Sequence, residues 1–194
     1  MAIVDVRDRL REAKGRERIY CRTDSHWNDR GAFVAYQQIM TALQRWYPGL
    51  APLPREAFAD AIDQEPGGDL AAMIGMKDVV REEGLLLRPR VPRRAQAAIA
   101  GMTMPHLTPW RQPHAFEIPG ASLPRAVMLR DSFGNALMPF LSEHFRRILY
   151  LYTKKLSPEV IAREEPQVVI QEFVERRLMQ APFGNDVDHR VSAR

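Results

Sequence analysis

Apolar residues near the start of the chain recur at the spacing of an α-helix. In residues 2–14 they form a narrow stripe between charged positions, which predicts a surface helix that ends near Gly15. Residues 31–46 carry a broader stripe, which predicts a helix with one buried face and with Asn28 as its N-cap. The stripe consists of Phe33, Tyr36, Ile39, Met40, Leu43 and Trp46.

Short continuous apolar runs in the second half of the chain predict strands. They occupy residues 126–129, 148–152 and 168–170, and such runs are typical of strands that are buried on both faces. Helices are predicted between them, from about 134 to 145 and from Ser157, whose successor is a proline suited to the first helical position. This alternation is typical of an α/β fold with a parallel sheet and covering helices.

Prolines and glycines interrupt the middle of the chain. The pattern there predicts a short helix at residues 55–62 and another at 69–73, with Asp69 as the N-cap of the second. Residues 85–87 and 115–118 are candidate strands. Six prolines break the segment that runs from the first of these to Pro119, which predicts a long irregular excursion of the kind that often roofs a site.

Composition narrows the class of protein. The 194 residues are 45% hydrophobic and 27% charged, which is typical of a globular domain and excludes a disordered or collagen-like chain. The net charge is only +4, and the basic residues are scattered in small pairs, so we expect solvated faces and no nucleic-acid partner. These pairs are Arg93-Arg94, Arg146-Arg147, Lys154-Lys155 and Arg176-Arg177.

The sequence says less about compartment. Cys21 cannot form an internal disulfide and, within an apolar stretch, is expected to be a buried inert thiol. No run is long enough for a membrane span, and the N-terminus lacks the basic and then apolar pattern of a signal peptide. We therefore expect either a cytoplasmic protein or a chain that begins after its targeting segment.

The first candidate for chemistry is the segment Asp24-Ser25-His26, which follows a short strand predicted at residues 18–22. A carboxylate two residues before an imidazole can reach Nδ1, fix the tautomer and leave Nε2 free as a base. The alternative is that Asp24 only caps a turn and that His26 is a surface or core residue. Spacing alone favours that alternative, because an Asp-x-His pattern is common.

The second candidate is Ser132, which lies between the strand predicted at residues 126–129 and the helix that follows it. In doubly wound sheets ligands bind at the carboxyl ends of strands, close to helix N-termini that favour a developing oxyanion. Ser132 is thus placed as a nucleophile, with its own backbone N–H as a candidate oxyanion donor. The alternative role, an N-cap for the following helix, is equally compatible with the pattern.

Other polar residues give weaker signals. Glu172, Glu175, Arg176 and Arg177 follow the last predicted strand and are expected either to form a salt-bridge cluster or to contact substrate. Trp27 is expected to pack in the core beside His26, with sugar stacking as the alternative. The remaining histidines lack ligand spacing, so neither a metal site nor a cofactor is predicted. They are His106, His114, His144 and His189.

In combination these segments are more specific. In chain order they are Arg22-Thr23-Asp24-Ser25-His26-Trp27-Asn28 with Gly31-Ala32, then Gly68-Asp69-Leu70-Ala71-Ala72-Met73-Ile74-Gly75, then Arg130-Asp131-Ser132-Phe133-Gly134, then residues 166–170 with Val174-Glu175-Arg176. In this order, over about residues 4–180, the chain resembles the AlgX/AlgJ-type SGNH-hydrolase-like domain of polysaccharide O-acetyltransferases.

The resemblance implies an SGNH-hydrolase-like three-layer fold and a Ser132/His26/Asp24 triad that forms an acetyl-serine intermediate, which a sugar hydroxyl resolves. The substrate-binding candidates beside this triad are Arg22, Trp27, Arg130, Glu172 and Arg176. The resemblance also implies work on exopolysaccharides such as alginate, in the periplasm or on the outer face of the cytoplasmic membrane. The expected partners are the polysaccharide and a membrane-bound protein that supplies acetyl groups.

The chain departs from that family in two ways. Only 23 residues precede Asp24, whereas further strands come first in the family, so we expect a partial domain over residues 1–180 that lacks its N-terminal strands. An exposed sheet edge or hydrophobic face would follow, and with it either a homodimer or poor stability. Residues 181–194 are expected to be a polar tail. Ser25 also replaces the commoner threonine, at a position with no expected chemical role.

Two other functions keep the same residues. An esterase with the same triad would release acetate to water. The triad does not distinguish an esterase from a transferase, because the choice of acceptor would lie in the loops of residues 89–119. A non-catalytic glycan-binding protein, or a truncated relative, would keep the fold and need no triad.

Overall fold

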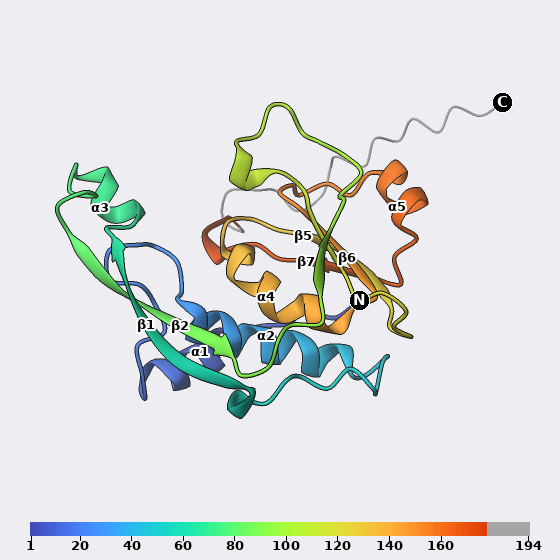
Figure 1. Ribbon diagram of the computed structural model, residues 1–194, viewed down its shortest axis with the longest axis horizontal. Coiled ribbons are helices and arrows are strands. Elements are labelled where there is room, and N and C mark those ends of the chain that lie inside the picture. Colours follow the sequence, from blue (N-terminus) through green and yellow to red (C-terminus); the bar gives the residue numbers. More distant parts are fainter. Residues whose placement is uncertain (178–194) are drawn as a thin grey trace.

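The computed structural model describes residues 1–177, which form a five-stranded sheet with helices on both faces and a separate two-stranded ribbon (Figure 1). The strand order of the sheet is β3-β4-β6-β5-β7. Its strands are β3 (Gln96–Ala98), β4 (His114–Glu117), β5 (Arg125–Leu129), β6 (Arg147–Leu151) and β7 (Val168–Gln171). The predicted tail at residues 181–194 and the last three residues of the predicted domain lie outside the described residues.

The three strands predicted from continuous apolar runs lie side by side and parallel. β5 pairs with β6 and with β7, so that Ala126 lies opposite both Ile148 and Val168. β4, which covers most of the candidate strand at residues 115–118, runs antiparallel to β6, and β3 runs antiparallel to β4. The sheet is therefore mixed, and its parallel part consists of the three strands predicted from continuous apolar runs. β7 and β3 are its edges.

Successive residues of β5 face opposite sides of the sheet, and each side has its own core. Ala126 and Met128 pack in the larger cluster, with the buried residues of the helices on one face, whereas Val127 and Leu129 pack in a smaller cluster on the other. The first face is covered by α2 (Asp29–Leu43), η3 (Phe133–Leu137) and α4 (Met138–Leu141). The second is covered by α5 (Pro158–Glu164) and by the loop near Met102. The predicted three-layer α/β arrangement is therefore confirmed.

The predicted helix starts are confirmed at two caps. The Asn28 side-chain oxygen accepts from the backbone N–H groups of Arg30 and Gly31, and α2 begins at Asp29. The Ser157 hydroxyl accepts from Val160 N–H, with Pro158 as the first residue of α5. The first predicted helix is α1 (Arg7–Lys14), whose Leu10 packs in the larger core.

The helix predicted at residues 55–62 is wrong. The segment forms a 3-10 turn, η1 (Arg55–Ala57), and then β1 (Phe58–Pro66). β1 pairs antiparallel along its whole length with β2 (Arg81–Pro89), which includes the predicted strand at residues 85–87. This long-range pairing outweighs the weak local preference for a helix. Figure 1 shows the resulting ribbon, which runs from beside α2 to α3 (Asp69–Met73).

Smaller differences occur near the predicted site. The strand predicted at residues 18–22 is reduced to one bridge between Tyr20 and Trp27. The helix predicted at residues 134–145 is divided into η3, α4 and η4 (Ser142–His144). Pro139 lies at its centre, where the lack of an N–H group interrupts α-helical bonding. Gly68, rather than Asp69, is the N-cap of α3.

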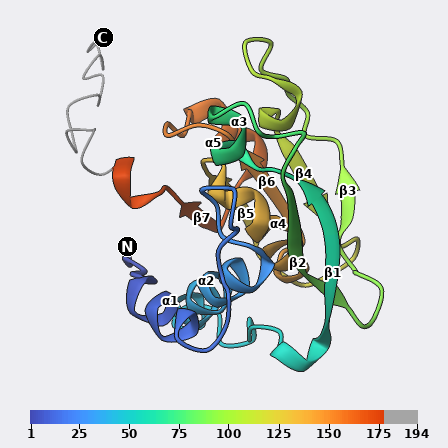
Figure 2. The ribbon, with the colours of Figure 1, turned by 90° about the vertical axis from the view of Figure 1, so that its left-hand side faces the viewer.

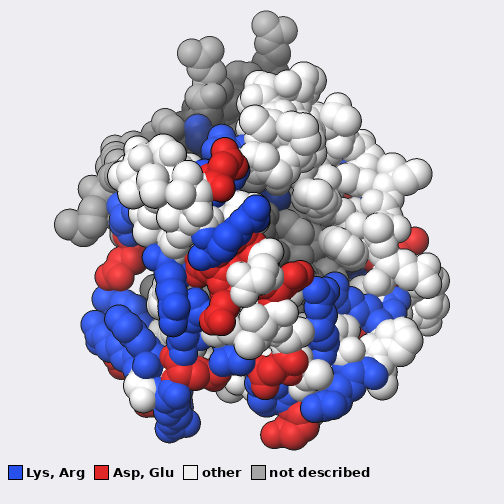
Figure 3. All heavy atoms as spheres, turned by 60° about the vertical axis from the view of Figure 1, so that its left-hand side comes forward, with Lys and Arg blue, Asp and Glu red and all other residues white. Residues whose placement is uncertain are grey.

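The irregular excursion predicted between the strands is confirmed, apart from β3 and a 3-10 turn, η2 (Pro109–Arg111). On the face shown in Figure 3, basic and acidic side chains are interspersed. Among the described residues, the helices are too short or too polar for any of them to span a membrane. Cys21 is partly buried, and burial together with nearby carboxylates raises the pKa of its thiol to about 12, in keeping with an inert thiol.

Glycine at position 165 should stabilise the protein. Glu165 follows α5 in the left-handed region (φ 44°, ψ 53°), where a β-carbon costs about 1–2 kcal/mol. Glycine removes this strain but gains freedom in the unfolded chain, so Glu165→Gly should add roughly 0.5–1 kcal/mol to the free energy of unfolding. Thermal unfolding should show a higher Tm for Glu165→Gly and an unchanged Tm for Glu165→Ala, which keeps the β-carbon. A lower Tm for the glycine variant would contradict the prediction.

Candidate active site

A short loop carries Asp24 and His26 to the carboxyl ends of the parallel strands. Its base is closed by hydrogen bonds from Cys21 N–H to the carbonyl oxygen of His26 (3.1 Å) and from Asn28 N–H to the carbonyl oxygen of Ile19 (3.1 Å). Figure 2 shows this loop, in blue, rising beside β5 and β7 toward α3. The cap at Asn28 therefore fixes both the start of α2 and the place where the chain turns.

Three side chains from the loop and the end of β5 form a continuous chain of hydrogen bonds. Asp24 Oδ1 lies 2.5 Å from His26 Nδ1 and accepts from the backbone N–H of His26 (2.9 Å). His26 Nε2 lies 2.8 Å from Ser132 Oγ. Because Nδ1 faces a carboxylate, it carries the proton, and Nε2 is left to accept the hydroxyl proton. The segments predicted to meet therefore do meet, over 106 residues of sequence.

The charge of Asp24 is stabilised within this chain. Burial acts to raise the pKa of Asp24, but hydrogen bonds from the Asp69 N–H and from His26 outweigh it and hold the pKa below its usual range. The side chains of Asp24 and His26 are about one quarter exposed, so the site is open to solvent. An ionised, anchored acceptor behind the imidazole is what a general base needs in order to take a second proton.

The position of Ser132 distinguishes its two predicted roles. Ser132 is the residue before η3, but its side chain makes no capping hydrogen bond and its hydroxyl bonds His26 instead. The arrangement therefore matches an activated nucleophile more closely than an N-cap.

Two carboxylates shape the turn around Ser132. Asp131 Oδ1 accepts from Phe133 N–H (2.9 Å), and Oδ2 accepts from Val174 N–H (2.9 Å). Glu172 accepts from the backbone N–H groups of Asp131 (3.1 Å) and Gly134. Within residues 1–177, the Ser132 N–H between these groups donates to no protein acceptor. It is therefore available to an oxyanion formed at Ser132.

The predicted contact residues fall into two groups, and the first lies around Phe133. Trp27 is buried, donates from Nε1 to the Phe133 carbonyl oxygen (3.1 Å) and meets the Phe133 ring edge-on. His26 lies against the same ring, with 4.6 Å between ring centroids, and the exposed Arg176 guanidinium lies 5.6 Å from the ring centroid. Arg22 has an exposed side chain on the loop. Arg176 and Arg22 are thus accessible from solvent, while Trp27 packs.

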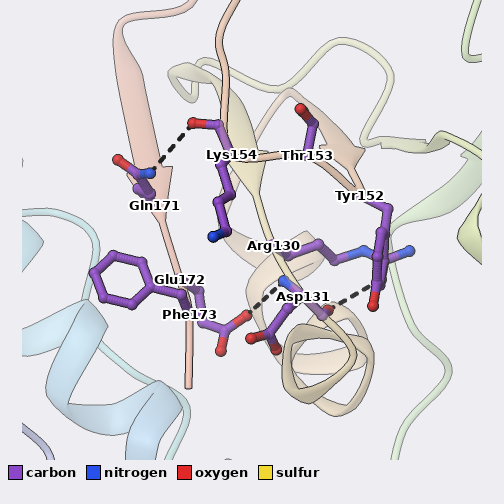
Figure 4. A pocket seen from close by; sticks show the side chains of 8 residues that line it. All are labelled: Arg130, Asp131, Tyr152, Thr153, Lys154, Gln171, Glu172 and Phe173. Carbon is purple, nitrogen blue, oxygen red and sulfur yellow. Dashed lines mark hydrogen bonds between the residues drawn. The ribbon is translucent and has the colours of Figure 1, made fainter. Parts of the chain in front are cut away.

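Arg130 and Glu172 belong to the second group and line a pocket of about 70 Å³ at the ends of β5, β6 and β7 (Figure 4). Arg130 is buried, donates to the Asp131 carbonyl oxygen (3.2 Å) and points toward the ring of Tyr152, 5.4 Å away. Glu172 binds backbone groups, and Glu175 pairs instead with Arg7 (3.2 Å). Among the described side chains neither carboxylate is paired with Arg176, and the side chain of Arg177, the fourth residue of the predicted cluster, lies outside them.

The Glu172 carboxyl should make the protein less stable as the pH rises. Burial and then the Asp131 carboxylate raise the pKa of Glu172 to about 8, against an ordinary value of 4.5. Between about pH 4.5 and about pH 8 the unfolded chain releases a proton that the folded state keeps, so stability falls by at most about 1.4 kcal/mol per pH unit. Glu172→Gln should flatten the decline of Tm over this range, and the exposed control Glu175→Gln should follow the parent. A decline unchanged in Glu172→Gln would contradict the assignment.

Three side chains in the loop region could offer ligand atoms to a cation. Asp24, His26 and Asp69 place one such atom each within 4.8 Å of one another. Asp24 Oδ1 and His26 Nδ1 already bond each other, and the Asp69 carboxylate accepts from the backbone N–H (2.7 Å) and the hydroxyl (2.5 Å) of Ser25.

The contacts that Asp69 and Glu82, on β2, make with the loop were not predicted. Glu82 lies in a run of charged residues that resembles a solvated face, so the sequence gives no signal for it.

Comparison with known proteins places this arrangement in a family. A family model described as the SGNH hydrolase-like domain of the acetyltransferase AlgX matches residues 1–102, more than half of the chain. The chain belongs to this AlgX family. The resemblance seen in the motifs is thereby confirmed, although the matched region ends before Ser132. A comparison with curated proteins finds no match.

Solved structures share the fold of this AlgX family member. A DHHW family protein from Eubacterium siraeum has a TM-score of 0.67 at 18% identity, over 87% of this chain and 62% of that chain. PatB1 from Bacillus cereus, in a structure with a sulfonyl adduct, has a TM-score of 0.61 at 18% identity, over 87% of this chain and 66% of that chain. The O-acetyltransferase domain of AlgJ from Pseudomonas putida has a TM-score of 0.51 at 22% identity, over 94% of this chain and 61% of that chain.

These likenesses show that the mixed α/β fold with open sheets is of the SGNH-hydrolase-like kind. The chain spans less than two thirds of the length of each of these three chains.

Proposed function

We propose that the chain is the catalytic part of a polysaccharide O-acetyltransferase, with Ser132 as nucleophile, His26 as base and Asp24 as the residue that orients His26. The observation that carries the proposal is the chain of hydrogen bonds from Asp24 Oδ1 through His26 to Ser132 Oγ. Membership of the AlgX family supports acyl transfer as the class of reaction.

In the proposed reaction Ser132 Oγ attacks the carbonyl carbon of an acetyl donor while His26 Nε2 takes the hydroxyl proton. The Ser132 N–H stabilises the oxyanion of the tetrahedral intermediate. Collapse of this intermediate breaks the bond to the leaving group, which takes the proton from His26. A sugar hydroxyl then attacks the acetyl-serine, gives its proton to His26, and leaves as the ester while the proton returns to Ser132.

The acceptor and partners are part of the same proposal and rest on the resemblance. We expect a polysaccharide acceptor, and a membrane-bound protein that supplies acetyl groups outside the cytoplasmic membrane. The open side of His26, with Arg22 and Arg176 exposed nearby, suits an extended polar acceptor better than a small enclosed substrate. A homodimer stays a prediction.

Intact-mass spectrometry after incubation with p-nitrophenyl acetate tests the proposal. An acetyl adduct should form on the parent and on Ser122→Ala, a matched control at an exposed serine, and should be absent from Ser132→Ala. Circular dichroism should show that all three are folded. Acetylated oligosaccharide after addition of an acceptor would distinguish a transferase from an esterase, which would release only acetate. A folded parent without an adduct would contradict the proposal.

A further inference from the structure

A buried carboxylate lies behind the loop that carries the proposed triad. Glu82, on β2, is 7% exposed, and its two oxygens are used by the loop. One accepts from Arg22 N–H, and the other accepts from Thr23 N–H (2.9 Å) and from the Thr23 hydroxyl (2.5 Å). Burial acts to raise the pKa of Glu82, but these hydrogen bonds hold it below its usual range. Glu82 therefore acts as an ionised acceptor for the residues just before Asp24.

The first turn of α3 holds the same loop from the other side. The Thr23 carbonyl oxygen accepts from the N–H groups of Leu70 (3.0 Å) and Ala71 (3.1 Å). Asp24 Oδ2 accepts from Asp69 N–H (2.9 Å), which leaves Oδ1 for His26. The proposed orienting carboxylate is thus itself oriented, because each of its oxygens has a separate donor.

The Asp69 side chain also binds the loop. Its carboxylate accepts from the backbone N–H and the hydroxyl of Ser25, and it lies 3.8 Å from His26 Nδ1. Three consecutive loop residues, Thr23, Asp24 and Ser25, are therefore each bonded to the β1–β2 ribbon or to α3 at its end. The loop itself has no helix or strand from residue 22 to residue 26, so these bonds supply its rigidity.

We propose that Glu82 and Asp69 are positioning residues, which hold Asp24 in the orientation that aligns His26 with Ser132. This inference rests on the proposed function and assigns the ribbon a part in it. A displacement of about 1 Å in a catalytic group can cost on the order of 10²-fold in rate, so residues that touch no substrate can control the reaction.

The packing of Gly68 supports the same conclusion. A β-carbon on Gly68 would lie 2.3 Å from Asp24 Cβ and 2.5 Å from Asp24 Oδ2, so even one methyl group would displace Asp24. Gly68 N–H also donates to the Thr23 hydroxyl oxygen (3.0 Å). The segment between β1 and α3 therefore packs directly against Asp24, the side chain that orients His26.

The first test is Glu82→Gln, with Glu83→Gln as its control. Glutamine keeps the size of the side chain but turns an NH₂ group toward a backbone N–H, so the loop should shift. We expect acetylation of Ser132 by p-nitrophenyl acetate to slow by roughly 10- to 100-fold in Glu82→Gln. The neighbouring Glu83 is exposed and does not bond the loop, so Glu83→Gln should acetylate at the parent rate. An unchanged rate in folded Glu82→Gln would overturn the proposal.

A double-mutant cycle separates positioning from general stability. In an Asp24→Asn background the orienting carboxylate is already lost, so adding Glu82→Gln should slow acetylation by less than threefold. Additive losses would show that Glu82 acts only through stability, and would overturn the proposal. Should Glu82→Gln fail to fold, Asp69→Asn enters the same cycle, with the exposed Asp78→Asn as its control.

A spectroscopic measurement keeps the test independent of activity. The proton between Asp24 and His26 should give a downfield proton NMR signal in the parent that disappears in His26→Ala. The proposal expects this signal to shift or broaden in Glu82→Gln and to stay unchanged in Glu83→Gln. A parent that shows the signal but forms no acetyl-serine would refute the proposed function alone. An unperturbed signal in Glu82→Gln would refute the positioning role alone.

Discussion

Alanine in place of His26 should slow the acetylation of Ser132 by on the order of 10³-fold or more. The hydroxyl of serine is a weak nucleophile at neutral pH, and His26 Nε2, 2.8 Å from Ser132 Oγ, is placed to take its proton as the bond to the acetyl carbon forms. Alanine removes this base and leaves only the oxyanion donor at Ser132 N–H. Stopped-flow measurement of p-nitrophenol release in a single turnover reports the rate directly.

The exposed His106 provides the matched control, because its imidazole has no hydrogen bond to the triad among the described residues, and His106→Ala should acetylate at the parent rate. Asp24→Asn should fall between the two, since asparagine keeps the shape but can no longer hold Nδ1–H and stabilise the imidazolium. A folded His26→Ala that acetylates within threefold of the parent would show that the hydrogen bond to Ser132 has no catalytic role.

The triad segments could be predicted because each lies where regular structure stops. Ser132 follows a continuous apolar run that makes a buried strand, and the loop of His26 precedes the clear cap of a strongly patterned helix. Their contact spans 106 residues, however, and neither spacing nor periodicity could show it. The family resemblance joined the two segments, and the geometry agrees with it.

The first strand of the ribbon, β1, and its pairing with β2 could not be predicted, for a physical reason. Beyond Phe58 every residue of β1 is partly or fully exposed, so the strand has no regular apolar alternation. It is held by pairing with β2, whose residues lie up to 31 positions away, as Phe58 opposite Pro89 shows. The role of Glu82 could not be predicted either, because it also depends on a contact between distant segments. In the sequence, a glutamate among charged neighbours resembles a solvated side chain.

Away from the site, the buried carboxylate of Glu164 joins α5 to the two central strands. It is 3% exposed and lies 2.7 Å from Arg147 Nε, 3.1 Å from Arg163 Nε and 3.4 Å from Arg125 Nη2. Burial acts to raise the pKa of Glu164, but the hydrogen bond and charge of Arg147 and then of Arg163 hold it below its usual range. The side chain of Arg147 is itself only 18% exposed.

Loss of this carboxylate should therefore have the largest effect on stability. Glu164→Ala removes the buried acceptor of three partly buried arginines and leaves Arg147 with only the exposed Glu117 as an acidic partner. Breaking a fully buried pair costs about 3–5 kcal/mol, and the partial exposure of the arginines places the expected loss near the lower end, about 3 kcal/mol. A chain of this size should lose roughly 10 °C in Tm. Glu117→Ala removes the exposed partner of the same arginine and should cost less than about 1 kcal/mol, because solvent screens that pair.

The pH dependence distinguishes an ionic contribution of Glu164 from one of shape. Because its folded pKa is lowered, the stabilisation is present above the unfolded value of 4.5 and is lost as the pH falls through the lower folded value. The Tm difference between the parent and Glu164→Gln should thus be largest near neutral pH and should shrink in acid. Equal differences at both pH values would show that packing, rather than charge, accounts for the effect.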